Sequence, residues 1–487
     1  MLKKWTTHAE YQTQLKFGIA SLTQNDKNRL FKSFPKSLLK LFLLNLDNLF
    51  SVVKPLYPEL GRPAKNQCEI IRSLVLMVDT KEYSITDWVD KTHSDSLIQI
   101  LCGFNNHIPG LASYYDLLHR LWLSKKPDRI KLRKFKRKPN KHYKANQKLP
   151  NRRPGVVRRL VNALQQDSLP DIRPERILQE ILKHAVVKPS AQLGLLGDID
   201  DFTIAVDGSP YYADGSSPYG VKVCNCKAEG NYHCDCPRKY SDPDASWGWD
   251  SYREQWFYGN TLFAVTAANS QNDLPIYLHM AQASRHDGVS TVFAVRNVIN
   301  MFPKITIKKF LADGAMDDYS IYEMLLKRNI QPFIPLPENT KFPTLEYYPE
   351  ISSFDDHGRP ICPAGYCWTH WGFDAKKQRH KYRCPFAAKG EPIPNSWTCT
   401  CCNKGKSAYG PSFYLKSNND IRLFPPVPVH ILFLDRSLRS CVSSSQYICS
   451  GTVCRHPYWH KQYFSLSSLF WIECYPWDRL PYHLHLI

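Results

Sequence analysis

Two apolar segments of this chain each end in the dipeptide Asp-Gly, and this repeated arrangement constrains the fold more than any other feature. Residues 203–206 read Thr-Ile-Ala-Val and lead into Asp207, while residues 310–312 read Phe-Leu-Ala and lead into Asp313. Short apolar runs that stop at turn residues are typical of buried strands. If the two strands are neighbours in one sheet, the two carboxylates emerge close together.

Two neighbouring carboxylates need a counterion, and hard oxygen ligands favour magnesium or manganese over zinc. Asp207 and Asp313 are therefore candidate metal ligands for chemistry at a phosphodiester, where bound metal activates a nucleophile and stabilises the leaving oxygen. The alternative is structural, because Asp before Gly is ordinary turn chemistry and each carboxylate could simply cap the turn that follows it.

The order of the surrounding segments predicts an α/β fold. Helical patterns at 289–301 and 319–328 separate the later strands. The order is three strands, then helix, strand, helix and strand, which is what an RNase H-like sheet produces. The predicted strands are 203–206, 261–266, 275–278, 310–312 and 331–334.

The first part of the chain reads as helices. Apolar residues recur at helical spacing between residues 68 and 122, and Ser84 to Asp87 resembles a capping box at the start of one helix. A further amphipathic helix is predicted at 174–187. Short helices before a basic segment favour a DNA-binding region, although a plain helical bundle fits the same pattern.

Positive charge is concentrated in one stretch of the chain. The formal net charge is +20, and residues 125–159 carry sixteen Lys and Arg against a single acid, Asp128. Such a segment can neutralise phosphates and release counterions, so it predicts DNA binding; the alternative is a solvated linker. The candidate DNA-binding residues are Lys131, Arg133, Lys134, Lys136, Arg137, Lys138, Arg152 and Arg153.

The sixteen cysteines fall into groups. In a large chain whose start lacks the apolar core of a secretory signal, grouped cysteines favour metal binding over disulfides. The tightest group, two Cys-x-Cys pairs, predicts a zinc site, although one intervening residue is unusual and free thiols in polar loops are the alternative. These residues are Cys224, Cys226, Cys234 and Cys236. A looser second group comprises Cys362, Cys367, Cys384, Cys399, Cys401 and Cys402, while Cys68 and Cys102 read as core residues.

Several stretches resemble the DDE transposases of bacterial insertion sequences, specifically the IS-four-type group. They include VDGSPYYADGSSPYG, SDPDASWGWDSYREQWFYGNTLF, SRHDGVS and FLADGAMDDYSIYEMLLKRNIQPFIPL, and the resemblance runs from about residue 60 to about residue 428. It implies an RNase H-like core, magnesium-dependent DNA strand transfer, a protein dimer, and Asp207 and Asp313 as the first two catalytic carboxylates. His286 and Asp287 match a segment usual in the family and read here as polar residues at a turn.

The family's third carboxylate, a Glu on a late helix, has no evident counterpart. Residues 430–487 contain no Ala, Asn or Met and a single Gly, and their three acids are Asp435, Glu473 and Asp478. An out-of-frame translation product would have this composition; a genuine aromatic-rich tail is the alternative. Loss of one member of a catalytic unit removes most of the rate, so the sequence predicts a transposase inactivated in its present form. The alternatives are a non-catalytic DNA-binding remnant and a zinc-binding nucleic-acid protein.

These patterns divide the chain into a helical DNA-binding region, a basic linker, an RNase H-like core with one Cys-rich insertion, a second Cys-rich insertion and an atypical tail. The corresponding ranges are 1–124, 125–165, 166–337 with 222–240, 338–428 and 429–487. No segment reaches the roughly 18 consecutive apolar residues of a membrane helix. The expected location is the cytoplasm, in association with the nucleoid.

Overall fold

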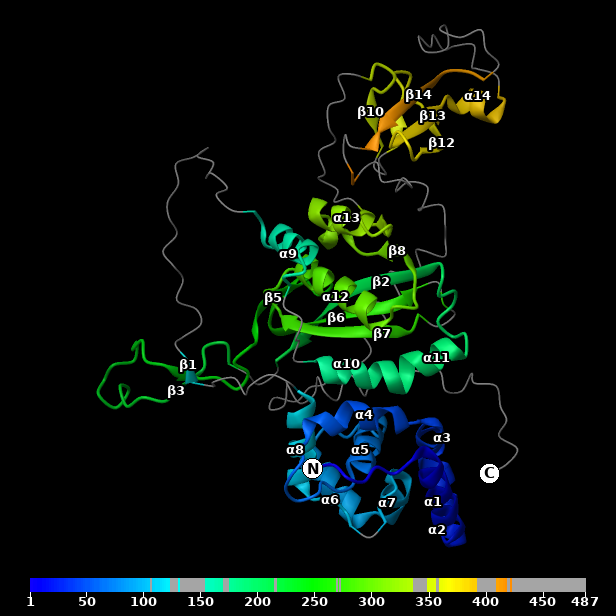
Figure 1. Ribbon diagram of the computed structural model, residues 1–487. Helices are drawn as coiled ribbons and strands as arrows, with labels where there is room; N and C mark the ends of the chain where they lie inside the picture. The colour runs from blue at the N-terminus through cyan, green and yellow to red at the C-terminus, as the bar shows by residue number, and fades with distance from the viewer. Residues whose placement is uncertain are drawn as a thin grey trace.

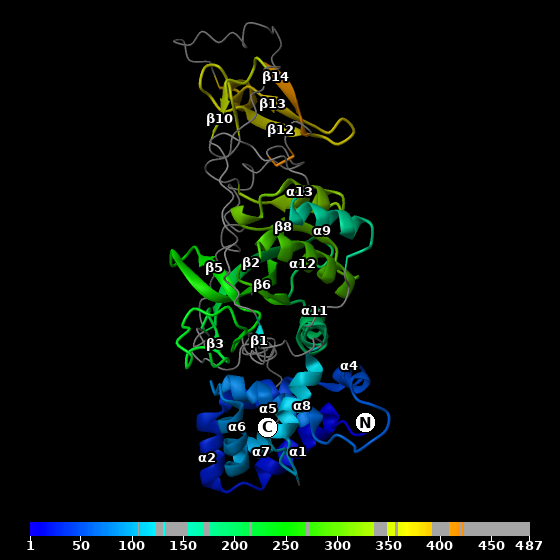
Figure 2. The ribbon, with the colours of Figure 1, turned by 90° about the vertical axis from the view of Figure 1, so that its left-hand side faces the viewer.

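The computed structural model describes residues 1–105, 107–122, 130–131, 154–169, 175–213, 217–268, 270, 273–335, 348–355, 359–391, 409–417 and 421–422. Figure 1 shows a helical region, a sheet region and a smaller β region following one another along the molecule, with the helical region at the lower end of the view. Figure 2 shows the same succession after a quarter turn. No helix among the described residues is long and apolar enough to cross a membrane.

The helical region contains the helices predicted between residues 68 and 122, together with earlier ones. Its elements are α1 (His8–Ala20), α2 (Gln24–Ser33), α3 (Pro35–Leu43), η1 (Asp47–Leu49), α4 (Phe50–Val53), η2 (Lys54–Leu56), α5 (Gln67–Asp79), α6 (Ile85–Ser94), α7 (Ser96–Cys102) and α8 (Leu111–Leu121). The Ser84 side chain accepts a hydrogen bond from the Asp87 backbone amide, which caps α6 as expected from the sequence. Cys68 and Cys102 are fully buried, which confirms that they are core residues.

The sheet region has the predicted strands and helices in the predicted order, and it also contains a strand at Ser246–Asp250 that the sequence did not predict. Its strands are β2 (Phe202–Tyr212), β5 (Ser246–Asp250), β6 (Gln255–Ala268), β7 (Pro275–Gln282), β8 (Ile307–Leu311) and β9 (Gln331–Phe333). They run β5-β6-β2-β8-β9, with β7 also pairing β6. β6 is antiparallel to β2 and β7, whereas β8 is parallel to β2 and β9. Helices α12 (Asp287–Met301) and α13 (Tyr319–Leu326) lie between the later strands in sequence. This arrangement confirms the RNase H-like core.

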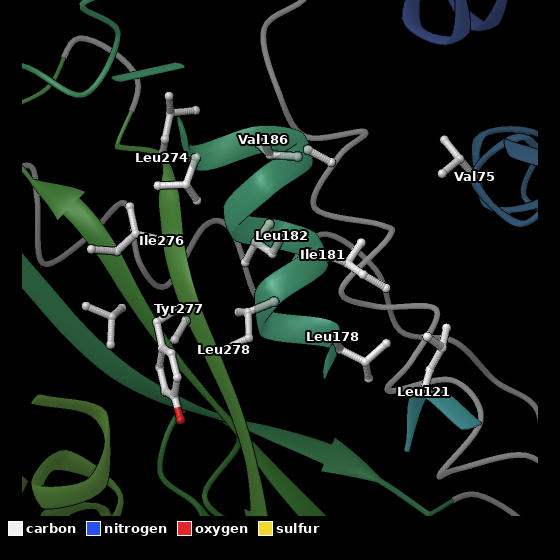
Figure 3. Close-up of a cluster of buried hydrophobic side chains, with 14 of the residues drawn as sticks. Val75, Leu121, Leu178, Ile181, Leu182, Val186, Leu274, Ile276, Tyr277 and Leu278 are labelled. Carbon is white, nitrogen blue, oxygen red and sulfur yellow. The ribbon is translucent and has the colours of Figure 1, made fainter. Parts of the chain in front are cut away.

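A helix joins the sheet region to the helical region. The predicted amphipathic segment consists of α10 (Arg176–Leu182) and the π-helical η3 (Lys183–Val187), which continues into α11 (Lys188–Gln192); Pro174 lies outside the described residues. Figure 3 shows α10 between β7 on one side and Leu121 and Val75 of the helical region on the other. The Gln179 side chain donates a hydrogen bond to the carbonyl of Leu278 and accepts one from its amide. It thereby pairs the backbone groups of Leu278 at the edge of the sheet formed by β7.

Two smaller units complete the described chain. In the first, β1 (Ile130–Lys131), β4 (Arg238–Lys239) and β3 (Val221–Lys222) form a three-stranded sheet in that order. The second contains β10 (Ser353–Phe354), β11 (Pro360–Ile361), β12 (Thr369–Asp374), β13 (Arg379–Arg383), α14 (Pro385–Lys389) and β14 (Ser412–Lys416). It has its own core, in which Trp368, Tyr382 and Phe413 pack together.

The basic linker of residues 125–165 includes a helix in addition to the short strand β1. Residues 156–165 form α9 (Val156–Gln165), whose Val157 and Val161 are buried against α12 and α13. Arg158 of α9 also forms an ion pair with Glu323 of α13. The end of the basic stretch is therefore packed on the sheet region.

Candidate active site and metal centre

The strand that contains Asp207 and the strand that leads into Asp313 are direct neighbours in the sheet. β2 and β8 pair in parallel, with Ala205 opposite Leu311. Asp207 lies two residues further along β2, and Asp313 lies two residues beyond the end of β8, so the two aspartates come to the same level. Because neighbouring strands lie about 4.8 Å apart, the two carboxylates start from adjacent backbone positions. The structure thus places the two aspartates that the sequence singled out at adjacent backbone positions.

Local hydrogen bonds orient both carboxylates. The Asp207 carboxylate accepts from the backbone amide of Gly208 at 2.8 Å. The Asp313 carboxylate accepts from the amide of Ala315 at 3.1 Å and caps η4 (Gly314–Met316). Asp313 therefore caps the turn that follows it, which is the structural role considered from the sequence. Among the hydrogen bonds of the described residues, this role uses only one of its two carboxylate oxygens.

A third carboxylate reaches the same edge of the sheet. Asp287 is the first residue of α12, and its carboxylate lies against the backbone of Gly208. A Cβ at position 208 would lie 2.7 Å from Asp287 Oδ1, so only glycine leaves room for this approach. The preceding residue, His286, caps the helix, with Nδ1 accepting from the amide of Gly288 at 3.1 Å. His286 is thus the polar turn residue that the sequence suggested, whereas the Asp287 carboxylate lies against Gly208 and close enough to Asp313 for their charges to interact.

The electrostatics of this edge reflect burial and crowding of negative charge. Burial, followed by the charge of Asp313, raises the pKa of Asp287 to about 6. Burial also raises the pKa of Asp313, while the Ala315 amide and His286 oppose that rise. The ionised carboxylates disfavour one another here, and a bound cation would relieve that cost. The oxygens of the three carboxylates do not all lie within 4.8 Å of one another.

The sequence alone did not assign a role to Asp287. Its position between a strand and a helix gives no sign that the helix starts beside Gly208 in the middle of β2, because that depends on how β7 is placed in the sheet. The signal present in the sequence was SRHDGVS, in which an acid stands at a helix start, where negative charge is favoured by the helix dipole.

The two Cys-x-Cys pairs converge. Cys224 and Cys234 have their sulfurs 3.5 Å apart, and Cys226 and Cys236 have theirs 3.6 Å apart. All four sulfurs lie within 4.8 Å of one another, and no other set of three or more His, Cys, Asp or Glu does so among the residues that the structure describes. Four thiolates about 2.3 Å from one zinc would be about 3.8 Å apart, so the donor set fits tetrahedral zinc.

The thiols of this group differ in protonation. Hydrogen bonds with the thiols of Cys236 and Cys224 raise the pKa of Cys226 to about 12, and the pKa of Cys236 is also raised, whereas that of Cys224 is lowered. The backbone amide of Cys226 and then the thiol of Cys234 lower the pKa of Cys224 to about 7. A lowered pKa favours the thiolate, which is the form that binds metal. In the second group Cys362 and Cys384 are buried in the core of the small β region, and Cys367 is partly exposed. Cys399, Cys401 and Cys402 lie outside the described residues.

Most of the predicted DNA-binding residues lie outside the described chain. Of the eight, only Lys131 is described, as the second residue of β1. The tail from residue 429 onward also lies outside the described residues, and it contains Asp435, Glu473 and Asp478. The prediction that the tail is out of frame therefore concerns residues that the structure does not describe.

Comparison with known proteins identifies the sheet region. Residues 193–361 match the family model described as the transposase DDE domain. Among solved structures, the piggyBac transposase synaptic complex with hairpin DNA is 11% identical over 92% of this chain and 75% of that chain, with a TM-score of 0.33. The pre-cleavage Mos1 transpososome is 10% identical over 97% of each chain, with a TM-score of 0.14. These scores are too low to carry an argument.

No curated protein matches the chain. The matched family segment contains β2, β8 and the start of α12, and so it includes Asp207, Asp287 and Asp313. The chain therefore contains a DDE transposase domain, formed by residues 193–361 around this sheet and its three carboxylates.

Proposed function

We propose that the chain acts on DNA as the transposase of an insertion sequence, cleaving and joining strands at the transposon ends. The observation that carries the proposal is the pairing of β2 with β8, which sets Asp207 beside Asp313 within the segment that matches the family. Two carboxylates on adjacent parallel strands are suited to hold a divalent cation at a reacting phosphate.

The donor set fits magnesium or manganese. Asp207 and Asp313 offer hard oxygen ligands, and Asp287 adds a third carboxylate at the same edge. When bound, the metal supplies activation of a water or a 3′-hydroxyl and stabilisation of the leaving oxygen. The chain contributes the position of these oxygens: the amides of Gly208 and Ala315 orient two of them, and the start of α12 supplies the third.

Asp287 bears on whether the chain is active. The sequence predicted inactivation because no Glu matches the family's third catalytic position. We propose that Asp287 serves as the third carboxylate, which makes strand cleavage by the chain as written the expected outcome. The alternative is a DNA-binding remnant, favoured by the composition of residues 430–487.

A strand-cleavage assay with magnesium tests this function. The substrate is a duplex carrying the ends of the insertion sequence. Asp207→Asn and Asp313→Asn should each lower the rate by about 10³-fold or more, because members of one catalytic unit are individually required. The matched control is Asp201→Asn at the other end of β2, where an exposed ion pair with Lys309 at 3.0 Å contributes little. Equal loss in the control would contradict the assignment.

A second experiment distinguishes an active transposase from a DNA-binding remnant that does not cleave DNA. The chain as written is assayed beside a version whose reading frame is restored after Pro428. Equal activity in both, abolished by Asp287→Asn, supports Asp287 as the third carboxylate. Activity only in the restored version would instead support inactivation by a shifted frame.

We further propose that Cys224, Cys226, Cys234 and Cys236 hold a second, structural metal, which is zinc. We also propose that DNA is the partner and that the chain acts as a homodimer. The net charge of +20 supports DNA as the partner. Light scattering of the purified protein, with and without DNA ends, measures the oligomeric state. A monomer under both conditions would contradict the dimer.

A further inference from the structure

The zinc-knuckle segment, residues 219–240, has almost no apolar core of its own. Its two strands, β3 and β4, are two residues each. Val221, Val223 and Tyr232 have 63%, 49% and 60% of their surface exposed. A hairpin this short is not stable in water without another source of stabilisation. The convergence of the four cysteine sulfurs between β3 and β4 supplies that source if a metal is bound.

The knuckle is anchored to the catalytic sheet at its base. Tyr240, directly after β4, is buried, and the Asp242 carboxylate accepts from the side-chain amide of Asn260 in β6 at 3.0 Å. Figure 1 shows β1 and β3 beside the sheet region, on the side where β5 lies. A hairpin fixed at its base would keep its strands in place if a bound metal also joined them at its tip.

The outer edge of this hairpin holds a strand from a distant part of the sequence. β4 pairs with β3 on one side and with β1 on the other, with Ile130 opposite Lys239 and Lys131 opposite Arg238. Ile130 is half exposed, so little apolar burial holds β1 in place. Backbone pairing with β4 therefore contributes to holding this segment, and it requires that β4 be already ordered.

Basic side chains gather on the knuckle. Lys222, Lys227, Arg238 and Lys239 lie within it, against the two acids Glu229 and Asp235. Tyr219 and Tyr232 are also exposed there, 50% and 60% respectively. Cations interleaved with exposed aromatic rings suit contact with nucleic-acid phosphates and bases.

We infer that zinc held by Cys224, Cys226, Cys234 and Cys236 orders β4 as a docking strand for residues 130–131, and that the resulting unit binds DNA phosphates beside the catalytic sheet. Zinc binding exchanges the thiol protons for metal–sulfur bonds and releases them to solvent. The inference rests on the proposed action on DNA for its ligand, whereas zinc binding and strand docking stand independently of that action.

The test uses the full-length protein purified without chelator. Elemental analysis should give one zinc per chain, which is lost in the double variant Cys224→Ser/Cys234→Ser and kept in Cys367→Ser, the matched control outside the knuckle. Trypsin should cut after Lys131 faster in the double variant than in the control, because β1 is released. A zinc-free wild-type protein, or zinc unaffected by the double variant, would overturn the inference.

DNA binding is then measured on a random-sequence duplex over a range of salt concentrations. With four basic side chains on the knuckle, the double variant should lose about 3 to 4 in the slope of log affinity against log salt and bind about tenfold or more weakly. Ile130→Pro, which removes a backbone donor from β1, should keep zinc and the knuckle's own contacts but show the rapid trypsin cleavage. The inference would be overturned if the double variant showed the wild-type rate of trypsin cleavage and the wild-type slope of log affinity against log salt. This outcome would count even if DNA strand cleavage by the catalytic carboxylates is confirmed.

Discussion

Replacing the Asp287 carboxylate with an amide should stabilise the metal-free protein at neutral pH. In the folded chain Asp287 is buried against Gly208 and close to the charge of Asp313, and these two causes raise its pKa from 3.8 to about 6. The folded state therefore binds a proton more tightly at this site than the unfolded state does. Asn keeps the size of the side chain and carries no charge.

The sign and size of the effect follow from the shift in pKa. Because the folded pKa is the higher one, the carboxyl group costs nothing below about pH 4, and its cost grows as the pH rises from about 4 to about 6. A shift of about two units, at about 1.4 kcal/mol per unit, amounts to about 3 kcal/mol above pH 6. Asp287→Asn should therefore raise the free energy of unfolding by about 2–3 kcal/mol at pH 7.5 and by little at pH 4.

Urea-dependent amide exchange of the β2 and β8 peptides in EDTA measures this difference within the sheet region. Wild type and variant are compared at the same pH, so the intrinsic exchange rate cancels. Asp201→Asn, exposed at the other end of β2, should change stability by less than about 1 kcal/mol. A variant that is less stable than wild type at pH 7.5, or shifted equally at both pH values, would refute the reasoning. Added magnesium should stabilise the wild type more than Asp287→Asn.

Three further outcomes are expected. Gly259→Ala should destabilise the sheet by about 3 kcal/mol or more in a urea titration, because the new Cβ would lie 2.1 Å from the Tyr211 carbonyl oxygen; a loss below about 1 kcal/mol would contradict this contact. Glu175→Ala should cost about 2–3 kcal/mol, since Glu175 holds the buried His279 at 2.8 Å; Glu175→Gln, which keeps an acceptor, should cost less. Truncation after Pro428 should shift the thermal midpoint by less than about 2 °C if the tail is out of frame, and a larger fall would show that the tail packs on the core.

Local patterns in the sequence were sufficient for the order of the elements and for the chemistry of two sites. The apolar runs before Asp207 and Asp313 predicted two buried strands, and the spacing of the four knuckle cysteines predicted a convergent group. Both depend on contacts within a few residues, where side-chain periodicity and loop length largely decide geometry. Strand lengths were underestimated, since β2 continues to Tyr212 and β6 begins at Gln255. The extensions contain polar and partly exposed residues, which apolar runs do not reveal.

Only the tertiary structure decided which distant segments meet. Asp287 comes close to Asp313 because β7 pairs with β6 and returns the chain so that α12 starts beside Gly208. Residues 130–131 meet β4 across more than a hundred residues through backbone hydrogen bonds, which carry no residue-specific signal. Periodicity records which face of an element is buried, but not which element covers it. That partner is selected by the packing of the whole domain, and so the third carboxylate and the docked strand emerged only from the fold.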